Sequence, residues 1–183
     1  MLCINLSEYW TTLLDLTIKL YSFTAWYVIY DFENGIAEWT LTGTVFNNQP
    51  TYGDNTLARN RGHSNHQGDY WIGGYENRPS PSHPAGGLQG DLPKGTMTSP
   101  KFLIRGPKLR FLIGGGCNIN KEWAELLIEG VVVAKETGKC SESMSTKQWN
   151  VLPYDGQLAQ LRLVDNQGYW GHINFDHLEG QYC

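Results

Sequence analysis

Most of the chain alternates between apolar and polar residues in short runs, which is the pattern of β-strands. Ala37–Phe46 alternates with a period of two, so every second side chain falls on the same face of a strand. Ala124–Glu136 has the same character around Glu129-Gly130, which predicts a β-hairpin that turns at this dipeptide. No segment shows a convincing amphipathic helical period. Short strands at regular spacing predict an all-β fold, an antiparallel β-sandwich.

Further strands and two long polar loops complete this picture. The other runs with strand character are residues 69–75, 96–104, 108–116, 147–154, 158–166 and 171–180. The loops are Asn47–Gln67 and Glu76–Gly95, and the second is rich in proline. Because binding specificity in sandwiches usually lies in long loops, these two are the first places to expect a ligand.

The N-terminal part differs from the rest. Thr11–Tyr30 is apolar, but Asp15 and Lys19 interrupt it, and no clean cleavage site follows. It is a poor membrane span, so membrane contact is not expected. We therefore interpret residues 1–30 as a degenerate targeting segment or a fragment of a preceding region, 31–180 as one β-sandwich module and 181–183 as a tail.

Composition and charge narrow the function classes. The 183 residues include 21 Gly, 7 Trp and 10 Tyr, and 17% are charged, a mixture typical of a β-rich domain with many turns. The net charge is -4 and no basic stripe is present to neutralise phosphates, which argues against nucleic acid as a partner.

The four cysteines, at positions 3, 117, 140 and 183, form no C-x-x-C pair, so a zinc ribbon or a thioredoxin-type site is not expected. Cys117 and Cys140 flank the predicted hairpin. A disulfide in an oxidising compartment and two buried thiols both agree with this placement.

Zinc and enzyme chemistry find little support in the pattern. His63 and His66 are three residues apart, and His172 and His177 are five apart. Side chains alternate between the faces of a strand, so His172 and His177 point in opposite directions and cannot share an ion without a bulge. The sequence has no nucleophile elbow, and nothing local marks its carboxylates as a catalytic pair. We expect a protein that is not an enzyme.

Calcium is the more credible metal. Glu33 follows the probable first strand and Asp176 lies in the last. Terminal strands of closed sandwiches commonly pair, which would bring these oxygen donors together, and calcium needs oxygen ligands with modest geometric precision. A surface glutamate and a turn-capping aspartate explain the same residues equally well.

Aromatic residues are more frequent at the strand ends than a core requires. They are Tyr70, Trp71, Tyr75, Tyr169 and Trp170. Aromatic faces stack on sugar rings while polar side chains bind hydroxyls, so these residue types suit carbohydrate. Core filling is the alternative, and it is the better explanation for Trp39, Trp123 and Trp149.

Six segments, in this order, resemble one known family. They are DFENGIAEWTLTGTVF, GDYWIGGYE, GTMTSPKFLI, LRFLIGGGC, AELLIEG and LRLVDNQGYWGHINFDHL. The family is a β-sandwich module attached to fructan-cleaving glycoside hydrolases of the levanase and inulinase type, and similar modules occur in animal extracellular proteins. The resemblance spans Asp31 to Gly180. It implies a galactose-binding-like jelly roll, a non-catalytic carbohydrate-binding role within a larger multidomain protein, and a structural calcium at Glu33 and Asp176. The cysteine pair at 117 and 140 is more typical of the animal versions.

The sequence therefore predicts a secreted module that binds a glycan or glycoprotein through loops at one end of the sandwich. The expected ligand-binding residues are Trp71, Tyr75, Arg78 and His83, followed by Arg59, Arg61, His63 and His66. The alternative is a protein-interaction or adhesion module of a larger receptor or matrix protein, because the opening DFENG…W superficially resembles MAM domains.

Overall fold

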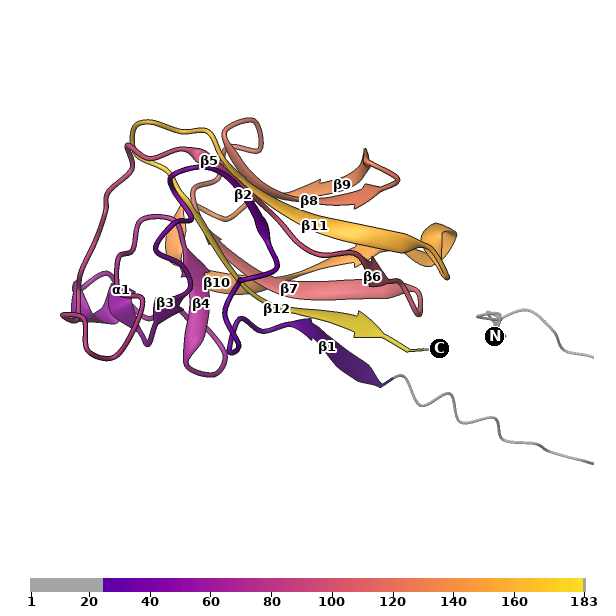
Figure 1. Cartoon of the computed structure of the whole chain (residues 1–183), viewed down its shortest axis with the longest axis horizontal. Helices are drawn as coiled ribbons and strands as arrows, with labels where there is room; N and C mark the ends of the chain where they lie inside the picture. The colour runs from indigo at the N-terminus through magenta and orange to yellow at the C-terminus, as the bar shows by residue number, and fades with distance from the viewer. Residues whose placement is uncertain (1–24, 183) are drawn as a thin grey trace, which may run out of the picture.

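The computed structural model describes residues 25–182, which form two facing antiparallel sheets (Figure 1). The first sheet has the order β10 (Ser141–Asn150), β7 (Lys108–Gly115), β12 (Ile173–Gln181), β4 (Tyr70–Gly73), β3 (Thr51–Tyr52), with β1 (Trp26–Tyr30) also paired to β12. The second has the order β2 (Thr40–Gly43), β5 (Gly95–Thr98), β11 (Leu158–Asp165), β8 (Glu122–Ile128), β9 (Val131–Glu136), with β6 (Phe102–Leu103) also on β11. The predicted antiparallel β-sandwich is confirmed.

The core lies between the two sheets and follows the period-two pattern. Phe111, Ile113 and Phe175 from the first sheet face Leu161 and Leu163 from the second, and all five are almost completely buried. Burying a side chain of this size stabilises the fold by about 1.5–3 kcal/mol relative to leaving it exposed. Apolar burial by alternate residues is thus what holds the two sheets together.

The β8–β9 hairpin turns where the sequence predicts. Glu129 and Gly130 have φ values of 50° and 79°, and positive φ at both central residues is the requirement of a type I′ turn, whose twist matches that of the strands. The run 96–104, by contrast, is two strands. Pro100 separates β5 from β6 because proline has no N–H for a strand ladder.

The sandwich begins earlier than the predicted boundary at residue 31. β1 starts at Trp26 and pairs with the end of β12, so the apolar run that reads as the end of a targeting segment is partly a strand. β12 continues to Gln181, past the predicted end at 180. The rest of the predicted targeting segment, with Cys3 and Cys183, lies outside the described residues.

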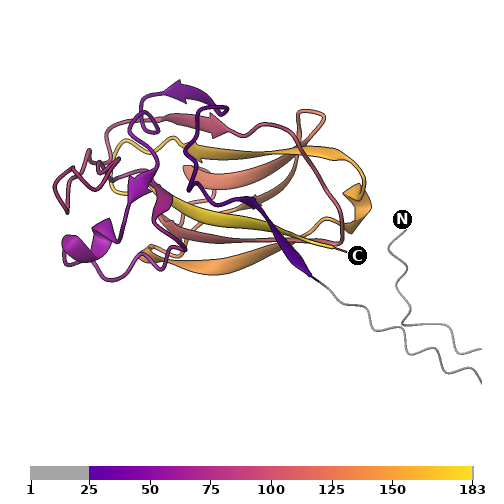
Figure 2. The same cartoon turned by 60° about the horizontal axis from the view of Figure 1, so that its bottom comes forward.

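The connections sort into two ends of the sandwich (Figures 1 and 2). At the end that we call the loop end, five connections gather: 53–69, 74–94, 116–121, 137–140 and 166–172. The opposite end carries the tight turns and both ends of the described chain. No helix in residues 25–182 has the length and apolar character needed to cross a membrane.

A disulfide joins two of the loop-end connections. Cys117 follows β7 and Cys140 precedes β10, their Cα atoms are 4.8 Å apart, and their side chains are bonded. Of the two alternatives left open by the sequence, the disulfide is therefore the one observed. It ties together the ends of two neighbouring strands.

Candidate functional site

The loop end contains a polar hollow with one exposed aromatic ring. We call it the loop-end hollow; its volume is about 220 Å³, and it is lined by Arg59, Arg61, Tyr75, Asp91, Glu142, Trp170 and His172. Arg59 follows the short helix α1 (Asn55–Ala58), Glu142 lies in β10, and His172 immediately precedes β12. Residues up to 113 positions apart in the chain thus meet at one place.

His172 is buried between two carboxylates. Its Nδ1 lies 3.0 Å from Asp91 Oδ1, its Nε2 lies 3.0 Å from Glu142 Oε2, and only 5% of the residue is exposed. Burial alone would lower its pKa, but the hydrogen bonds and charges of Glu142 and Asp91 outweigh burial and raise the pKa to about 9. His172 is therefore an imidazolium at neutral pH, with both ring nitrogens donating.

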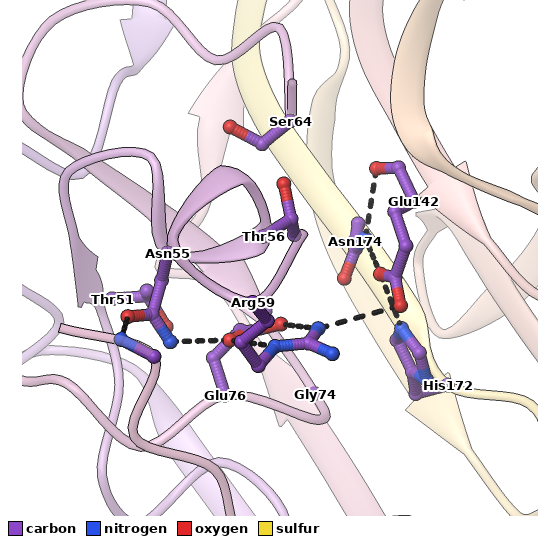
Figure 3. A network of polar contacts seen from close by, with 12 residues as sticks. Thr51, Asn55, Thr56, Arg59, Ser64, Gly74, Glu76, Glu142, His172 and Asn174 are labelled. Atoms are coloured by element: carbon purple, nitrogen blue, oxygen red, sulfur yellow. Dashed lines mark hydrogen bonds and ion pairs between the residues drawn. The ribbon is translucent and has the colours of Figure 1, made fainter. Parts of the chain in front are cut away.

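Glu142 links His172 to the rest of the network (Figure 3). Its carboxylate also accepts from Asn174 Nδ2 at 3.2 Å and from Arg59 Nη2 at 3.3 Å. Burial would raise its pKa, but His172, Asn174 and Arg59 lower it to about 2. Glu142 is thus ionised and held in place by three donors.

Arg59 is fixed on its other side by a buried acid. Its guanidinium makes two hydrogen bonds to the carboxylate of Glu76, one of them from Nε to Oε2 at 3.2 Å, and Glu76 is completely buried. Asn55 donates to the same carboxylate. The guanidinium also lies over the Tyr75 ring, 4.7 Å from its centroid. A two-point pair of this kind fixes orientation as well as charge.

The helix α1 sets the position of Arg59. Asp54 is its N-cap residue, and the carboxylate of Asp54 accepts from the backbone N–H of Leu57 at 3.3 Å. Such caps satisfy donors that a helix leaves unpaired in its first turn. Asn55 and Arg59 lie four residues apart, and both reach Glu76 from this single turn of helix.

Three lining groups remain available to a ligand. Trp170 is 58% exposed, Arg61 is exposed, and Tyr75 is partly buried, with its ring centroid 5.2 Å from that of His172. The hollow therefore combines a flat apolar surface with hydrogen-bonding groups whose positions are already fixed. Such a combination suits a ligand with both an apolar face and polar edges.

The structure brings together three of the eight predicted ligand-binding residues, namely Arg59, Arg61 and Tyr75. Trp71 requires a correction: it has no exposed surface, and its indole N–H donates to Gly53 O at 2.8 Å. Alternation predicts that one of two successive residues in a strand is exposed. Here the loop 53–69 covers the outer face, and His66 stacks on Trp71 with ring centroids 6.1 Å apart.

The other four predicted residues do not line the loop-end hollow. Arg78 lies over the Tyr52 ring, 5.1 Å from its centroid, and its Nε donates to His83 O at 3.3 Å. His63 Nδ1 contacts Asp54 Oδ2 at 2.8 Å, and His66 Nδ1 contacts Ser64 Oγ at 2.6 Å. Ligand binding by these residues stays a prediction.

Sequence reasoning did not place four of the lining residues in the site: Asp91, Glu142, Trp170 and His172. Trp170 belongs to the surplus of aromatic residues and His172 to the histidines considered for zinc. Their residue types therefore indicated a functional role, although nothing in the sequence placed them in this hollow. Asp91 and Glu142 are ordinary acids in their local context, and only the fold brings them to His172.

His172, which precedes β12, and His177, which lies in it, are separated, as predicted. His172 lies at the loop end, whereas His177 Nε2 is 3.6 Å from Glu179 Oε1. The strand is irregular between Asp176 and Glu179, and His177 has a φ of 53°. Because of this bulge Leu178, rather than His177, is the next buried residue of the core after Phe175, so the predicted face of His177 is corrected.

The two predicted calcium ligands converge on one turn. Asp176 Oδ2 accepts from Gln67 N at 2.7 Å, and Glu33 Oε1 accepts from Asp69 N and Tyr70 N, both at 2.9 Å. Asp176 Oδ1 is buried and has no hydrogen-bond partner in the described part of the chain. Burial, together with nearby carboxylates, raises the pKa of Asp176 to about 8. This donor set fits a hard cation.

The side chains alone do not complete a metal site. Within residues 25–182, no group of three or more His, Cys, Asp or Glu side chains is arranged to hold a metal ion. A calcium ion at Glu33 and Asp176 would therefore need main-chain carbonyls or water for the rest of its coordination.

Comparison with known proteins gives one relative in sequence and several in fold. No family model matches the chain. Over 141 residues it is 31% identical to "Putative glycosyl hydrolase ecdE" of Aspergillus rugulosus. The aligned region covers 76% of this chain but only 18% of that protein. The chain thus spans less than a fifth of the length of this relative.

Two solved structures illustrate the likeness in fold. The K1 cleaved adhesin domain of Lys-gingipain from Porphyromonas gingivalis W83 is 17% identical with a TM-score of 0.46, covering 85% of this chain and 96% of that domain. The carbohydrate-binding module TmCBM61, solved with β-1,4-galactotriose, is 11% identical with a TM-score of 0.49, covering 83% of this chain and 92% of that module.

Proposed function

We propose that this chain is a non-catalytic carbohydrate-binding module that holds a glycan in the loop-end hollow. The observation that carries the proposal is the exposed Trp170 ring beside fixed charged side chains. A sugar ring has an apolar face of C–H groups and a rim of hydroxyls. Stacking on Trp170 accounts for the face, and the charged side chains account for the rim.

The polar groups of the hollow are already oriented before a ligand arrives. Glu142 is held by His172, Asn174 and Arg59, and Asp91 is held by His172. Arg61 is exposed and free to donate to hydroxyls. Because these groups are already fixed, binding has a smaller entropic cost. We expect weak affinity per site, as is usual for exposed polar recognition.

The relative in sequence supports a role inside a larger protein. The matching segment is 18% of a protein whose name refers to glycosyl hydrolysis, so this chain corresponds to one module of such a protein. A binding module tethered to an enzyme raises the local concentration of substrate through effective concentration. The Cys117–Cys140 disulfide supports an extracellular location, because disulfides persist in oxidising compartments.

We also propose that Glu33 and Asp176 hold a structural calcium ion. The unpartnered Asp176 Oδ1 and the convergence of both carboxylates on the turn 67–70 support it. When bound, the ion would neutralise these acids and fix the turn that covers Trp71. Asp176→Asn should then reduce the gain in melting temperature that calcium gives to the protein.

A glycan array tests the main proposal. The wild-type chain should bind one group of neutral glycans, with fructans such as levan and inulin among the first to examine. Trp170→Ala and Arg61→Ala should each weaken binding about tenfold or more. Tyr169→Ala is the matched control, because Tyr169 is an exposed neighbouring aromatic that does not line the hollow. Glycan hydrolysis that one carboxylate substitution abolishes would instead show an enzyme.

One surface favours the alternative of a protein-interaction module. At the end opposite the hollow, Val131 in the edge strand β9 is 64% exposed and Leu158 is 54% exposed. Exposed apolar residues on an edge strand can pair with another chain. An array without binding, together with a protein partner whose binding is lost in Val131→Lys, would favour this function.

A further inference from the structure

Two buried carboxylates lie opposite each other in the second sheet, where β8 and β11 meet the loop end. Glu122 opens β8, Asp165 closes β11, and they are directly opposite in the antiparallel ladder. They are 3% and 2% exposed. Alternation places them on the same inward face as Ala124 and Leu163, which are core residues. Directly opposed side chains in such a ladder have Cβ atoms about 4.5–5.5 Å apart.

Within residues 25–182, neither acid is paired with an Arg or Lys, and one of their oxygens has no hydrogen-bond partner. Glu122 Oε1 accepts from Asn118 N at 3.1 Å, and Asp165 Oδ1 accepts from Gln167 N at 3.3 Å. Glu122 Oε2 is buried and makes no hydrogen bond within residues 25–182. Burying a carboxylate without a counter-charge is very costly, so this pair requires a partner.

Burial raises the pKa of both acids and the charge of His172 lowers it, but no cation of the network is paired with either of them in the part of the chain that the structure describes. Five carboxylates gather in this region: Glu76, Asp91, Glu122, Glu142 and Asp165. The cations nearby are Arg59, Arg61 and His172 in the hollow, and Lys94, which lines a surface pocket together with Asp165. Arg59 and His172 are already engaged by the other three acids, and Arg61 is exposed at the surface. Among the described residues, no ion pair joins Glu122 or Asp165 to any of these cations.

Glycines let the main chain approach the pair closely. A Cβ on Gly116 would collide with Glu122 Oε1, and one on Gly171 would lie 3.2 Å from the same oxygen. A Cβ on Gly74 would lie 3.0 Å from Asp165 Oδ2 and 3.2 Å from the carbonyl oxygen of Ile173. Main chain, with its carbonyl oxygens, therefore reaches the two carboxylates at positions where only glycine fits.

We propose that Glu122 and Asp165 bind a divalent cation, with calcium as the ion that their oxygens suit best. Calcium accepts carboxylate, carbonyl and water oxygens in flexible geometry. The ion would give Glu122 Oε2 its missing partner and neutralise the two carboxylates. It would also hold together the start of β8, the end of β11 and the segment 166–172 that carries Trp170.

This site is separate from the one proposed at Glu33 and Asp176, and it does not depend on glycan binding. The test is a calcium titration of the full chain by calorimetry after removal of metal with a chelator. Glu122→Gln/Asp165→Asn should bind one calcium fewer per chain than the wild type. Asp176→Asn should keep the ion that the double variant loses. Glu179→Gln is the control, because Arg110 already pairs with Glu179.

Melting curves without calcium show whether the double variant folds. Its amides are nearly the same size as the acids and remove two buried charges, so it should melt at or above the wild-type temperature in chelator. The single variant Asp165→Asn should bind the ion at least about tenfold more weakly. The proposal is overturned if the wild type binds no calcium, or if the double variant binds as many ions as the wild type. A proton shared by the two acids would then be the remaining partner.

Discussion

His172 depends on its two carboxylate neighbours for its charge, and they depend on it. With a pKa of about 9 instead of the usual 6.5, its protonated form contributes stability that is complete below about pH 6.5. That contribution is lost as the pH rises through about 9. Because the residue is buried, the loss should be roughly 3 kcal/mol in the free energy of unfolding.

Unfolding at several pH values tests this. His172→Gln should be less stable than the wild type at pH 6.5, and the difference should shrink towards pH 10. Asp176 also titrates between these values, but it does so in both proteins and cancels in the difference. Asp165 titrates there too, and because burial raises its pKa while the charge of His172 lowers it, the difference reports His172 together with its effect on Asp165. The exposed His83 gives the control variant, His83→Gln. Parallel curves for wild type and His172→Gln would show that His172 is not charged.

Arg59 is the second residue on which the site depends. Arg59→Lys should lower the free energy of unfolding by roughly 2–4 kcal/mol, because a lysine cannot replace the two-point contact with the buried Glu76. Chemical denaturation measures the change. Arg61→Lys, at an exposed position in the same hollow, should stay within about 0.5 kcal/mol of the wild type. Equal losses in both variants would contradict the structural role assigned to Arg59.

At the level of single residues, the sequence indicates which residue types suit a ligand, but it does not show which of them the fold brings together. Arg59, Arg61 and Tyr75 were expected at the ligand because they lie in or beside the long loops, and the fold does bring them together. Trp71 was assigned to the ligand by its strand position, since the sequence does not reveal that loop 53–69 covers it. Asp91 and Glu142 meet His172 only through pairings between distant segments.

At the scale of elements, the strands follow from alternation, and turn chemistry decides their limits. Glu129-Gly130 has the positive φ values of the predicted turn, and Pro100 divides a run that alternation alone reads as one strand. The short strand β3 and helix α1 were not expected within Asn47–Gln67, because a two-residue strand and a four-residue helix leave too little periodicity to detect.

The disulfide is the element-level feature that most directly supports the site. It closes a loop with a sequence separation of 23, which corresponds to roughly 3 kcal/mol of stability in the chain-entropy model. Cys117→Ser/Cys140→Ser should therefore melt at a lower temperature and bind glycan more weakly, since Glu142 lies two residues after Cys140. Thermal melting with and without reductant, and binding under the same conditions, check both effects. Unchanged melting in reductant would contradict a stabilising role for this bond.

In the molecule as a whole, the loop-end hollow and the two ends of the described chain lie at opposite ends of the sandwich. The loop end carries the hollow, while both ends of the described chain leave from the opposite end (Figures 1 and 2). In the proposed role as one module of a longer protein, the chain would present its ligand site away from the neighbouring domain. This arrangement agrees with a chain that matches 18% of a much longer relative.

Glycan binding at Trp170 can be followed by an NMR titration of the tryptophan indole N–H resonances with the glycan that the array selects. The Trp170 resonance should shift progressively with glycan concentration, while those of the buried Trp71 and Trp149 should stay in place. A Trp170 resonance that does not move while the glycan binds elsewhere would contradict binding at Trp170.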